Sequence, residues 1–298
     1  WNAPSGAADF YDHQIANSCR FNNADTSKMQ KSLGTATNDK KFTFSTWCKL
    51  SSYPSGTTRD RCLLGGLDET SATRIFALGF TQEAADFSQL TFIDYPTSGA
   101  VSSLVYLKRN TRDFAAWTHV VLSYDSTQAV AANRVKMYIN GELQSLFDTY
   151  ASGGSATPFY PDENQVSFNH TNNAIAVGNG RNSDDLSFDG YIAETYFIDG
   201  TGYAGSDFGE TKNGVWIPKD ASGLTFGNNG FHLKYEASSN LGNDSNGGTD
   251  LTESNISAHD QMIDTPTFNS SSNGGNFAVW DVLSRTNPAL QYGTSLYS

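Results

Sequence analysis

The stretch WTHVVLSYDSTQAVAANRVKMYINGEL, from Trp117 to Leu143, decides the fold class of this chain. Its first part alternates with a period of two and carries apolar residues on both faces, which is typical of a strand inside a two-layer sandwich. A second alternating run, Val135–Asn140, predicts the next strand. Asn140-Gly141 then predicts a tight hairpin, because both central positions of a type I′ turn need positive φ.

Ten further segments of this kind flank the central stretch, and turn-forming residues separate them. They are Ile15–Phe21, Met29–Leu33, Phe42–Leu50, Cys62–Gly66, Arg74–Phe80, Gln89–Asp94, Val101–Leu107, Ala174–Gly178, Phe188–Asp199 and Phe231–Tyr235. No long segment with helical periodicity interrupts them. Short strands at this spacing predict an all-β, antiparallel two-sheet sandwich.

Composition agrees with this fold class and excludes some functions. The 298 residues are 38% hydrophobic, 13% aromatic and only 17% charged, as in turn-rich β proteins. A formal net charge of −12 argues against nucleic-acid binding, which needs clustered Lys and Arg. We find neither a signal peptide nor an apolar run of membrane-spanning length, so no membrane insertion is expected.

The low-complexity ends of the chain predict three regions. Residues 1–14 are small and polar and predict an N-terminal arm. Residues 15–269 are expected to form the sandwich domain, and residues 270–298 a linker and C-terminal tail. The chain starts at Trp1 rather than Met, so further residues are expected before it. Cys19, Cys48 and Cys62 cannot all pair and lack metal-site spacing, which favours buried thiols in a protein made in a reducing cytosol.

Several of these segments resemble one family. RFNNAD (Arg20–Asp25), FTFSTWCKL (Phe42–Leu50), WTHVVLSYD (Trp117–Asp125), RVKMYINGE (Arg134–Glu142) and FDGYIAETYFIDG (Phe188–Gly200) resemble the laminin-G-like, concanavalin A-like jelly roll. STQAVAANRVKMY (Ser126–Tyr138), FGET with GVWIP, and residues 226–267 are similar to proteins of tailed bacteriophages of marine bacteria. The resemblance spans roughly residues 15–269 and leaves only the two ends outside it.

The resemblance implies a jelly-roll sandwich with extended terminal arms, whose loops bind glycans or proteins, often with calcium. It also implies a protein of the virion, assembled in the host cytoplasm, in a tail fibre or on the capsid surface. Host cell-surface glycans and other virion proteins are the expected partners, and the protein is expected in many copies or as a homo-oligomer.

Two groups of loop residues are candidate ligand sites. The loop 179–189 clusters amides and carboxylates, which calcium prefers, and it resembles by position the calcium loop of pentraxin-type jelly rolls. Asn182, Asp184 and Asp185 are its candidate metal ligands; an ordinary solvated turn is the alternative. Exposed rings can stack on sugars, so the tyrosines in predicted loops are candidate glycan contacts, with loop packing as the alternative: Tyr53, Tyr95, Tyr150, Tyr160 and Tyr203.

Three other polar groups favour structural roles. Asp244, Asn246 and Asp250 surround a glycine turn without a distal bidentate glutamate, so we interpret Asp244 as the cap of its own turn. His119 alternates into a strand and is interpreted as a hydrogen-bonded sheet histidine. Glu194 could act as acid or nucleophile on a concave face, but it lacks a partner acid with glucanase spacing.

The sequence thus predicts a non-enzymatic virion surface protein that attaches to host glycans. A structural capsid decoration or stabilising protein is the first alternative. A tail-spike polysaccharide hydrolase that uses Glu194 is the second.

Overall fold

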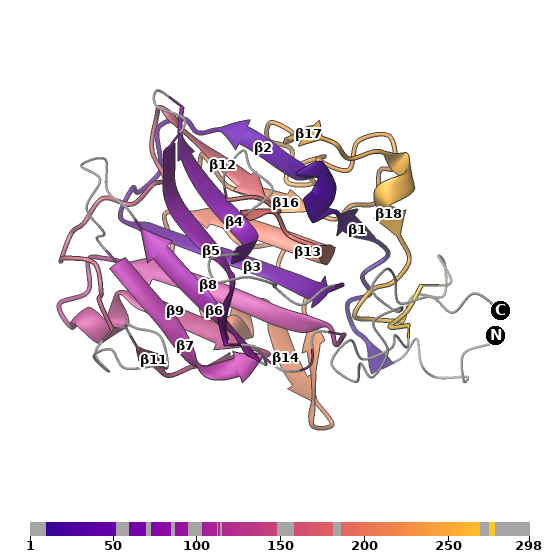
Figure 1. Cartoon of the computed structure of the whole chain (residues 1–298), viewed down its shortest axis with the longest axis horizontal. Coiled ribbons are helices and arrows are strands. Elements are labelled where there is room, and N and C mark those ends of the chain that lie inside the picture. The colour runs from indigo at the N-terminus through magenta and orange to yellow at the C-terminus, as the bar shows by residue number, and fades with distance from the viewer. Residues whose placement is uncertain are drawn as a thin grey trace.

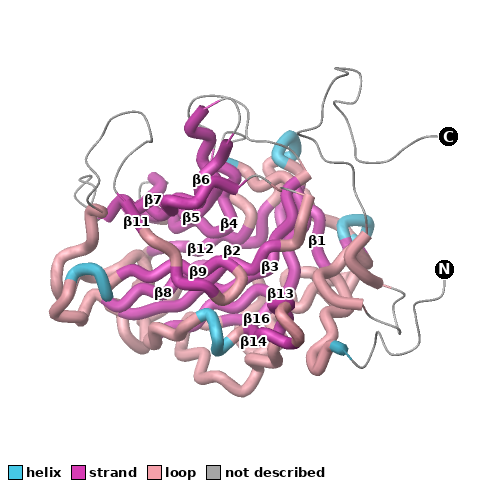
Figure 2. Tube along the Cα trace, turned by 90° about the horizontal axis from the view of Figure 1, so that it is seen from below, coloured by secondary structure: helices cyan, strands magenta, loops and turns pink. Residues whose placement is uncertain are grey.

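The fold is described from a computed structural model over residues 10–51, 60–69, 73–84, 87–94, 103–111, 113, 115–147, 158–180, 186–268 and 274–277. Its named elements are β-strands and three-residue 3-10 helices (Figure 1). Two large antiparallel sheets lie one above the other (Figure 2). The prediction of an all-β, antiparallel two-sheet jelly-roll sandwich is confirmed. No helix of the described residues is long and apolar enough to cross a membrane.

One sheet, called sheet A here, carries the stretch that decided the fold. Its order is β10 (Glu142–Leu143), β9 (Val135–Ile139), β8 (Thr118–Asp125), β3 (Lys41–Leu50), β13 (Gly190–Asp199), β1 (Ser18–Phe21) and β18 (Gln261–Met262), and β16 (Phe231–Leu233) also pairs with β13.

The opposing sheet, sheet B, has the order β11 (Leu146–Phe147), β7 (Ser103–Thr111), β6 (Phe87–Asp94), β5 (Thr73–Ala84), β4 (Asp60–Asp68), β12 (Asn173–Val177), β2 (Lys28–Ser32) and β17 (Thr252–Ser254). A separate hairpin pairs β14 (Gly209–Lys212) with β15 (Val215–Pro218). The 3-10 helices named within the described residues lie in the connections and are η1 (Asn23–Asp25), η2 (Ala131–Asn133), η4 (Gly205–Asp207) and η5 (Ala258–Asp260).

The main core lies between the two sheets and is rich in aromatic rings. Phe42 and Phe44 of β3 point inward, while Phe76 and Phe92 meet them from sheet B, all with no exposed surface. The Phe42 ring stacks on Tyr124 at 5.0 Å and meets Phe76 edge-on at 5.8 Å. Alternation on β3 and β8 therefore directs one face of each strand into this core, as the sequence predicted.

The outer face of sheet A is also buried, by chain that crosses it. Phe208, Ala221 and Phe226 pack on Val121, Tyr196 and Ile198 of the sheet. Beside them Ile15 packs with Trp47, Trp117 and Ala193. Lys49, on the same face, pairs with Asp264 at 2.8 Å, and Asp264 also accepts a hydrogen bond from the Trp117 indole. The apolar residues on both faces of β8 follow from this double burial.

The structure adds strands that the sequence did not predict, namely β11, β14, β15, β17 and β18, whereas β10 completes the hairpin predicted at Asn140-Gly141. Each has only two to four residues, too few for an alternating pattern to stand out. The terminal regions cannot be compared in full, because residues 1–9, 269–273 and 278–298 lie outside the described residues. Within the described part, residues 10–17 and 261–268 lie against sheet A.

Gly141 and Gly214 give a matched test of how the β14–β15 hairpin packs on the β9–β10 turn. Their φ angles are nearly equal, +78° and +80°, but a Cβ at Gly141 would overlap the Trp216 indole whereas one at Gly214 would meet nothing within 4 Å. Gly214→Ala should cost about 1 kcal/mol of unfolding free energy, from backbone strain alone. Gly141→Ala should cost about 3 kcal/mol, because overpacking adds to that strain. Urea denaturation measures both, and equal losses would contradict this packing.

Candidate functional site

A buried carboxylate positions one end of the sandwich. Asp199, the last residue of β13, is only 1% exposed. Its two oxygens accept hydrogen bonds from the backbone amides of Thr37 (2.7 Å), Asn38 (3.4 Å) and Asn229 (3.1 Å), and from the side chain of Asn169 (2.7 Å). A buried charge is stable only when it is satisfied in this way. Asp199 therefore fixes the loop between β2 and β3.

Two asparagines extend this network. The Asn229 side chain donates to Asn169 Oδ1 at 2.9 Å and to the carbonyl of Gly34 at 3.1 Å, and its oxygen accepts from the Gly34 amide at 2.8 Å. Both asparagines are buried. Three segments that are distant in sequence are thus held together, and a fully paired polar network of this kind is rigid.

A polar cleft of about 310 Å³ opens beside this network. Its lining residues come from the β2–β3 loop and from the turn before β12: Thr35, Ala36, Thr37, Asn38, Asp39, His170 and Thr171. The cleft lies at the start of β12, whereas the predicted calcium loop follows the end of that strand. Hydroxyl, amide and carboxylate groups with a few methyl groups are the mixture that recognises a polyhydroxylated ligand.

His170 presents a fixed imidazole to the cleft. Its Nε2 accepts from the Asn173 side chain at 3.0 Å, so its Nδ1 carries the proton and donates to the Thr171 carbonyl at 2.8 Å. The assignment of the tautomer rests on these two partners. Among the seven lining residues, Asp39 carries the formal charge and no Lys or Arg is present.

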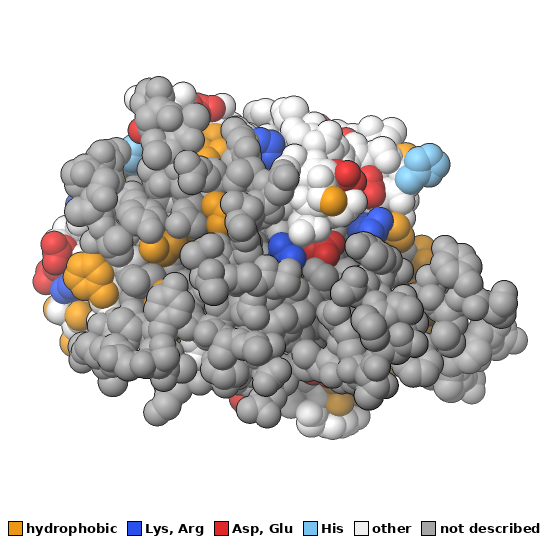
Figure 3. Space-filling view, in the orientation of Figure 1, with side chains coloured by type: hydrophobic (Ala, Val, Ile, Leu, Met, Phe, Trp, Pro, Cys, Tyr) orange, Lys and Arg blue, Asp and Glu red, His pale blue; other side chains and the backbone are white. Residues whose placement is uncertain are grey.

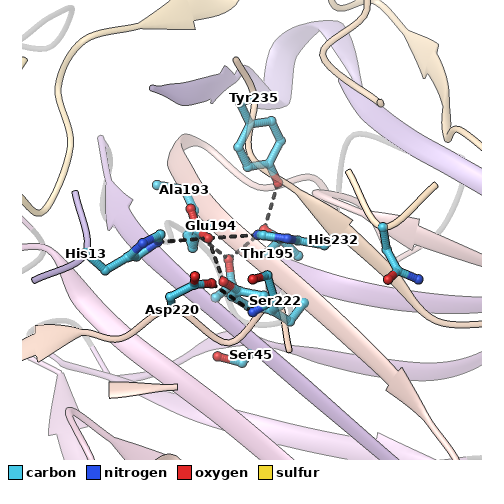
Figure 4. Close-up of polar contacts among 12 residues, drawn as sticks. His13, Ser45, Ala193, Glu194, Thr195, Asp220, Ser222, His232 and Tyr235 are labelled. Atoms are coloured by element: carbon cyan, nitrogen blue, oxygen red, sulfur yellow. Dashed lines mark hydrogen bonds and ion pairs between the residues drawn. The ribbon is translucent and has the colours of Figure 1, made fainter. Parts of the chain in front are cut away.

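A second polar cluster is centred on Glu194, in a bulge of β13 (Figure 4). Glu194 has a φ of +48° and is 4% exposed. Its Oε1 accepts from the Tyr196 hydroxyl (2.6 Å) and contacts Nε2 of His232 (2.8 Å) and of His13 (3.2 Å). Bulges and left-handed non-glycine residues are often functional features, so this cluster needs its own interpretation.

The electrostatics of the Glu194 cluster disfavour acid catalysis. Although burial opposes the charged form, hydrogen bonds from His13 and His232 hold the pKa of Glu194 well below its usual value. Burial and the adjacent carboxylate raise the pKa of Tyr196. Glu194 is thus a permanent anion at neutral pH, whereas a glycosidase acid needs a raised pKa.

His119 also lacks the arrangement of a hydrolase. The Trp216 indole donates to its Nδ1 at 3.1 Å, so Nε2 carries the proton and donates to Ser45 Oγ at 2.9 Å. Burial lowers the pKa of His119 to about 3. Trp47 stacks on the ring with centroids 4.9 Å apart. The imidazole cannot take a proton from Ser45, and the interpretation of His119 as a hydrogen-bonded sheet histidine is confirmed.

The predicted glycan-contact tyrosines are not assembled into one surface within the described residues. Tyr160 packs against the main core and Tyr203 against the separate cluster on the outer face of sheet A. Both are partly buried, as loop packing would require. Tyr53, Tyr95 and Tyr150 lie outside the described residues. Glycan contact by any of the five stays a prediction.

The predicted calcium ligands Asn182, Asp184 and Asp185 also lie outside the described residues. Of the residues flanking them, Asn179 is buried and its amide donates to Ser187 Oγ at 2.7 Å. In the part of the chain that the structure describes, no group of three or more His, Cys, Asp or Glu could hold a metal ion. Calcium binding stays a prediction.

The turn at 243–250 is a capped structural turn, as the sequence predicted. Asp244 accepts hydrogen bonds from the backbone amides of His232 (2.9 Å), Asn246 (3.0 Å) and Gly248 (3.1 Å). The Asp244 amide in turn donates to Asp250 at 2.9 Å. These acids are occupied by N–H donors, which explains the missing distal glutamate.

Sequence reasoning identified Glu194 as a candidate acid or nucleophile but missed its partners and the cleft. The local signals were the Asp199-Gly200 pair that ends a strand and a second acid, Glu194, inside the same strand. Their partners are up to 162 and 181 residues away along the chain. No spacing rule connects residues so far apart.

Removing the Asp199 carboxylate should loosen the cleft wall and destabilise the fold. Asp199→Ala leaves its N–H donors unpaired, so we expect a loss of about 3 kcal/mol or more in unfolding free energy. Asp39→Asn, on the same loop but half-exposed, is the control and should change stability by less than about 0.5 kcal/mol. Urea denaturation compares the two, and a similar small effect of both would contradict the role of Asp199.

Comparison with known proteins agrees with this architecture. The chain resembles three solved structures at low identity: a heptameric SAP-like pentraxin from Limulus polyphemus (11% identity, TM-score 0.39, 62% of this chain, 77% of that one), the enzymatically active domain of bacteriophage CBA120 tailspike protein 2 (13%, 0.42, 70% and 28%), and domain 4 of the Geobacillus stearothermophilus arabinanase AbnA in complex with arabinotriose (18%, 0.39, 64% and 75%). No curated protein matches. Residues 22–201, well over half of the chain, match Laminin_G_3, and the protein therefore belongs to the concanavalin A-like lectin/glucanases superfamily.

Proposed function

We propose that this protein is a non-enzymatic surface protein of a bacteriophage particle, in a tail fibre or on the capsid, and that it binds host glycans through the cleft beside Asp39. The observation that carries the proposal is the polar cleft of about 310 Å³, whose wall the buried Asp199 holds in place. A rigid wall lowers the ordering cost of binding. Membership of a superfamily of lectins and glucanases supports a sugar ligand.

The lining chemistry favours neutral sugars. Thr35, Thr37, Asn38 and Thr171 offer hydroxyl and amide groups to sugar hydroxyls, and Asp39 can accept from two of them. An acidic sugar would bring its carboxylate or sulfate toward Asp39 with no lining Lys or Arg to balance it. In the described part of the face in Figure 3, acidic and basic side chains lie beside one another rather than in one basic patch.

A site of this size binds a few sugar residues weakly. Display in many copies on a particle would raise the avidity well above that of one site. The similarity of the sequence to tailed-phage proteins supports the virion location. The free, buried thiols of Cys19 and Cys48 suit assembly in a reducing cytoplasm.

A glycan array probed with the whole protein tests the proposal. We expect binding to neutral oligosaccharides, weakened about tenfold by Asp39→Ala and by Thr171→Val, because each removes a hydrogen-bonding group from the cleft. Asp113→Ala changes an exposed acid outside the lining and serves as the control. If Asp113→Ala lost binding, or if the cleft variants bound as tightly as the wild type, the glycan site would lie outside the cleft.

The same array, repeated with a chelator, addresses calcium. Binding that a chelator abolishes would favour a calcium-dependent site at Asn182, Asp184 and Asp185 over the cleft. Binding to no glycan in either condition would contradict glycan attachment and favour a structural capsid decoration or stabilising protein.

The non-enzymatic assignment has its own test, centred on Glu194. Incubation with host polysaccharide should release no reducing sugar, because Glu194 is only 4% exposed and its Oε1 is already occupied by Tyr196, His232 and His13. Release of reducing ends by the wild-type protein, and its loss in Glu194→Gln, would overturn the assignment in favour of a tail-spike hydrolase. His13→Gln alters the same cluster at its exposed side and controls for indirect effects.

A further inference from the structure

The segment Phe10–Asn17, called the strap here, lies across the outer face of sheet A before β1 begins. Ile15 anchors it: the side chain is 1% exposed against Trp47 and Trp117, and its amide donates to Thr267 Oγ1 at 2.8 Å. Asn17 donates to the Met262 carbonyl at 3.3 Å. These contacts join the strap to the sheet and to the segment 262–267.

Toward its N-terminal end, polar and ionic contacts predominate. Asp12 pairs with Lys212 of β14 at 3.0 Å, and Lys212 also lies over the Phe10 ring. The Asp12 carboxylate is 69% exposed, and exposed ion pairs contribute little. His13 reaches further in, with its side chain 17% exposed and its Nε2 3.2 Å from the buried Glu194. His13 is therefore the strap residue whose charge acts at a buried site.

Glu194 presents one oxygen to two imidazoles, from opposite sides (Figure 4). His232 is fixed on β16, stacked on the Tyr196 ring at 4.1 Å and 2% exposed. His13 comes from the strap, and its side chain is 17% exposed. Without His13, Glu194 would still have His232 and Tyr196 as partners.

We propose that the strap is a pH-sensitive clasp, closed on sheet A when His13 is protonated and loosened when His13 is neutral. The charged form gains an ion pair with a permanent anion in a site of low dielectric constant. The neutral form keeps at most one hydrogen bond to the same oxygen. When open, the strap uncovers the apolar strip of Trp47 and Trp117.

The direction of the pH dependence follows from the groups that face His13. Burial opposes its charge, Glu194 and Asp220 favour it, and Lys234 opposes it; together they raise the pKa of His13. Docking energy from a raised pKa is fully present below the pKa of the free histidine and is lost as pH rises through the docked value. Glu194, whose pKa is lowered, stays charged throughout this range. Tyr11 has a pKa raised above 10 and titrates only at higher pH.

Hydrogen–deuterium exchange of the whole protein tests the clasp. The protection factor of peptides covering Phe10–Asn17, corrected for intrinsic exchange, should fall several-fold between pH 6 and pH 9. By linkage, the ratio of the protection factor at low pH to that at high pH approaches ten raised to the difference between the docked and free pKa values of His13. Peptides covering β8 should show no such change, which separates opening of the strap from unfolding. Acrylamide quenching of tryptophan fluorescence should rise over the same range.

His13→Gln is the decisive variant, because glutamine keeps an N–H donor for Glu194 but has no charge to lose. Its strap protection should be independent of pH and close to the wild-type value at pH 9. His259→Gln removes an exposed histidine and should retain the wild-type dependence. Unchanged strap protection in the wild type between pH 6 and 9, or the same fall in His13→Gln, would overturn the proposal.

Discussion

The buried carboxylate of Asp199 is the constraint on which the proposed binding site depends. It ends the central strand of sheet A, and N–H groups from the β2–β3 loop, from Asn169 and from Asn229 point at it. Each of these segments belongs to a different connection, and each would otherwise need its own partner for its buried polar groups. The Asp199 carboxylate accepts hydrogen bonds from all three segments. The β2–β3 loop lines the cleft, and its hydrogen bonds to Asp199 hold this lining in place.

Double burial of sheet A explains why binding is expected at an end of the sandwich rather than on this sheet. Its inner face packs on sheet B, and its outer face is covered by the strap, the β14–β15 hairpin and the segment around Asp264. A flat sheet face covered in this way cannot receive an extended sugar chain. Loops at the strand ends carry function most easily, because a rigid scaffold supports them.

Much of the fold could be predicted because period-two alternation is a local property. Phe42–Leu50 and Phe188–Asp199 were recognised as strands and form the centre of sheet A. The β14–β15 hairpin was missed although Asn213-Gly214 carries the same turn signal as Asn140-Gly141, and all four residues have positive φ. Its strands have four residues each, which is too short to show the period-two alternation that predicted the longer strands.

The candidate site could not be predicted in the same way, because its parts meet only after folding. The acidic loop at Asn182–Asp185 was predicted to bind calcium because its polar residues are adjacent in sequence, as they are in calcium-binding loops. The cleft is instead lined from Thr35–Asp39 and from His170–Thr171, more than a hundred residues apart. The local sequence around Asp199 does not indicate that Thr37 and Asn229 are its hydrogen-bond partners. Side-chain contacts across a sandwich are a property of the topology.

The two acids of β13 serve opposite purposes because their donors differ. Backbone and amide N–H groups satisfy Asp199, and none of these donors titrates near neutral pH. Two imidazoles contact Glu194, and one of them, His13, belongs to the strap. Because an imidazole can gain or lose a proton, the contact of His13 with Glu194 is the one that the proposed clasp makes pH-dependent. The four residues between Glu194 and Asp199 thus separate the wall of the cleft from the proposed clasp.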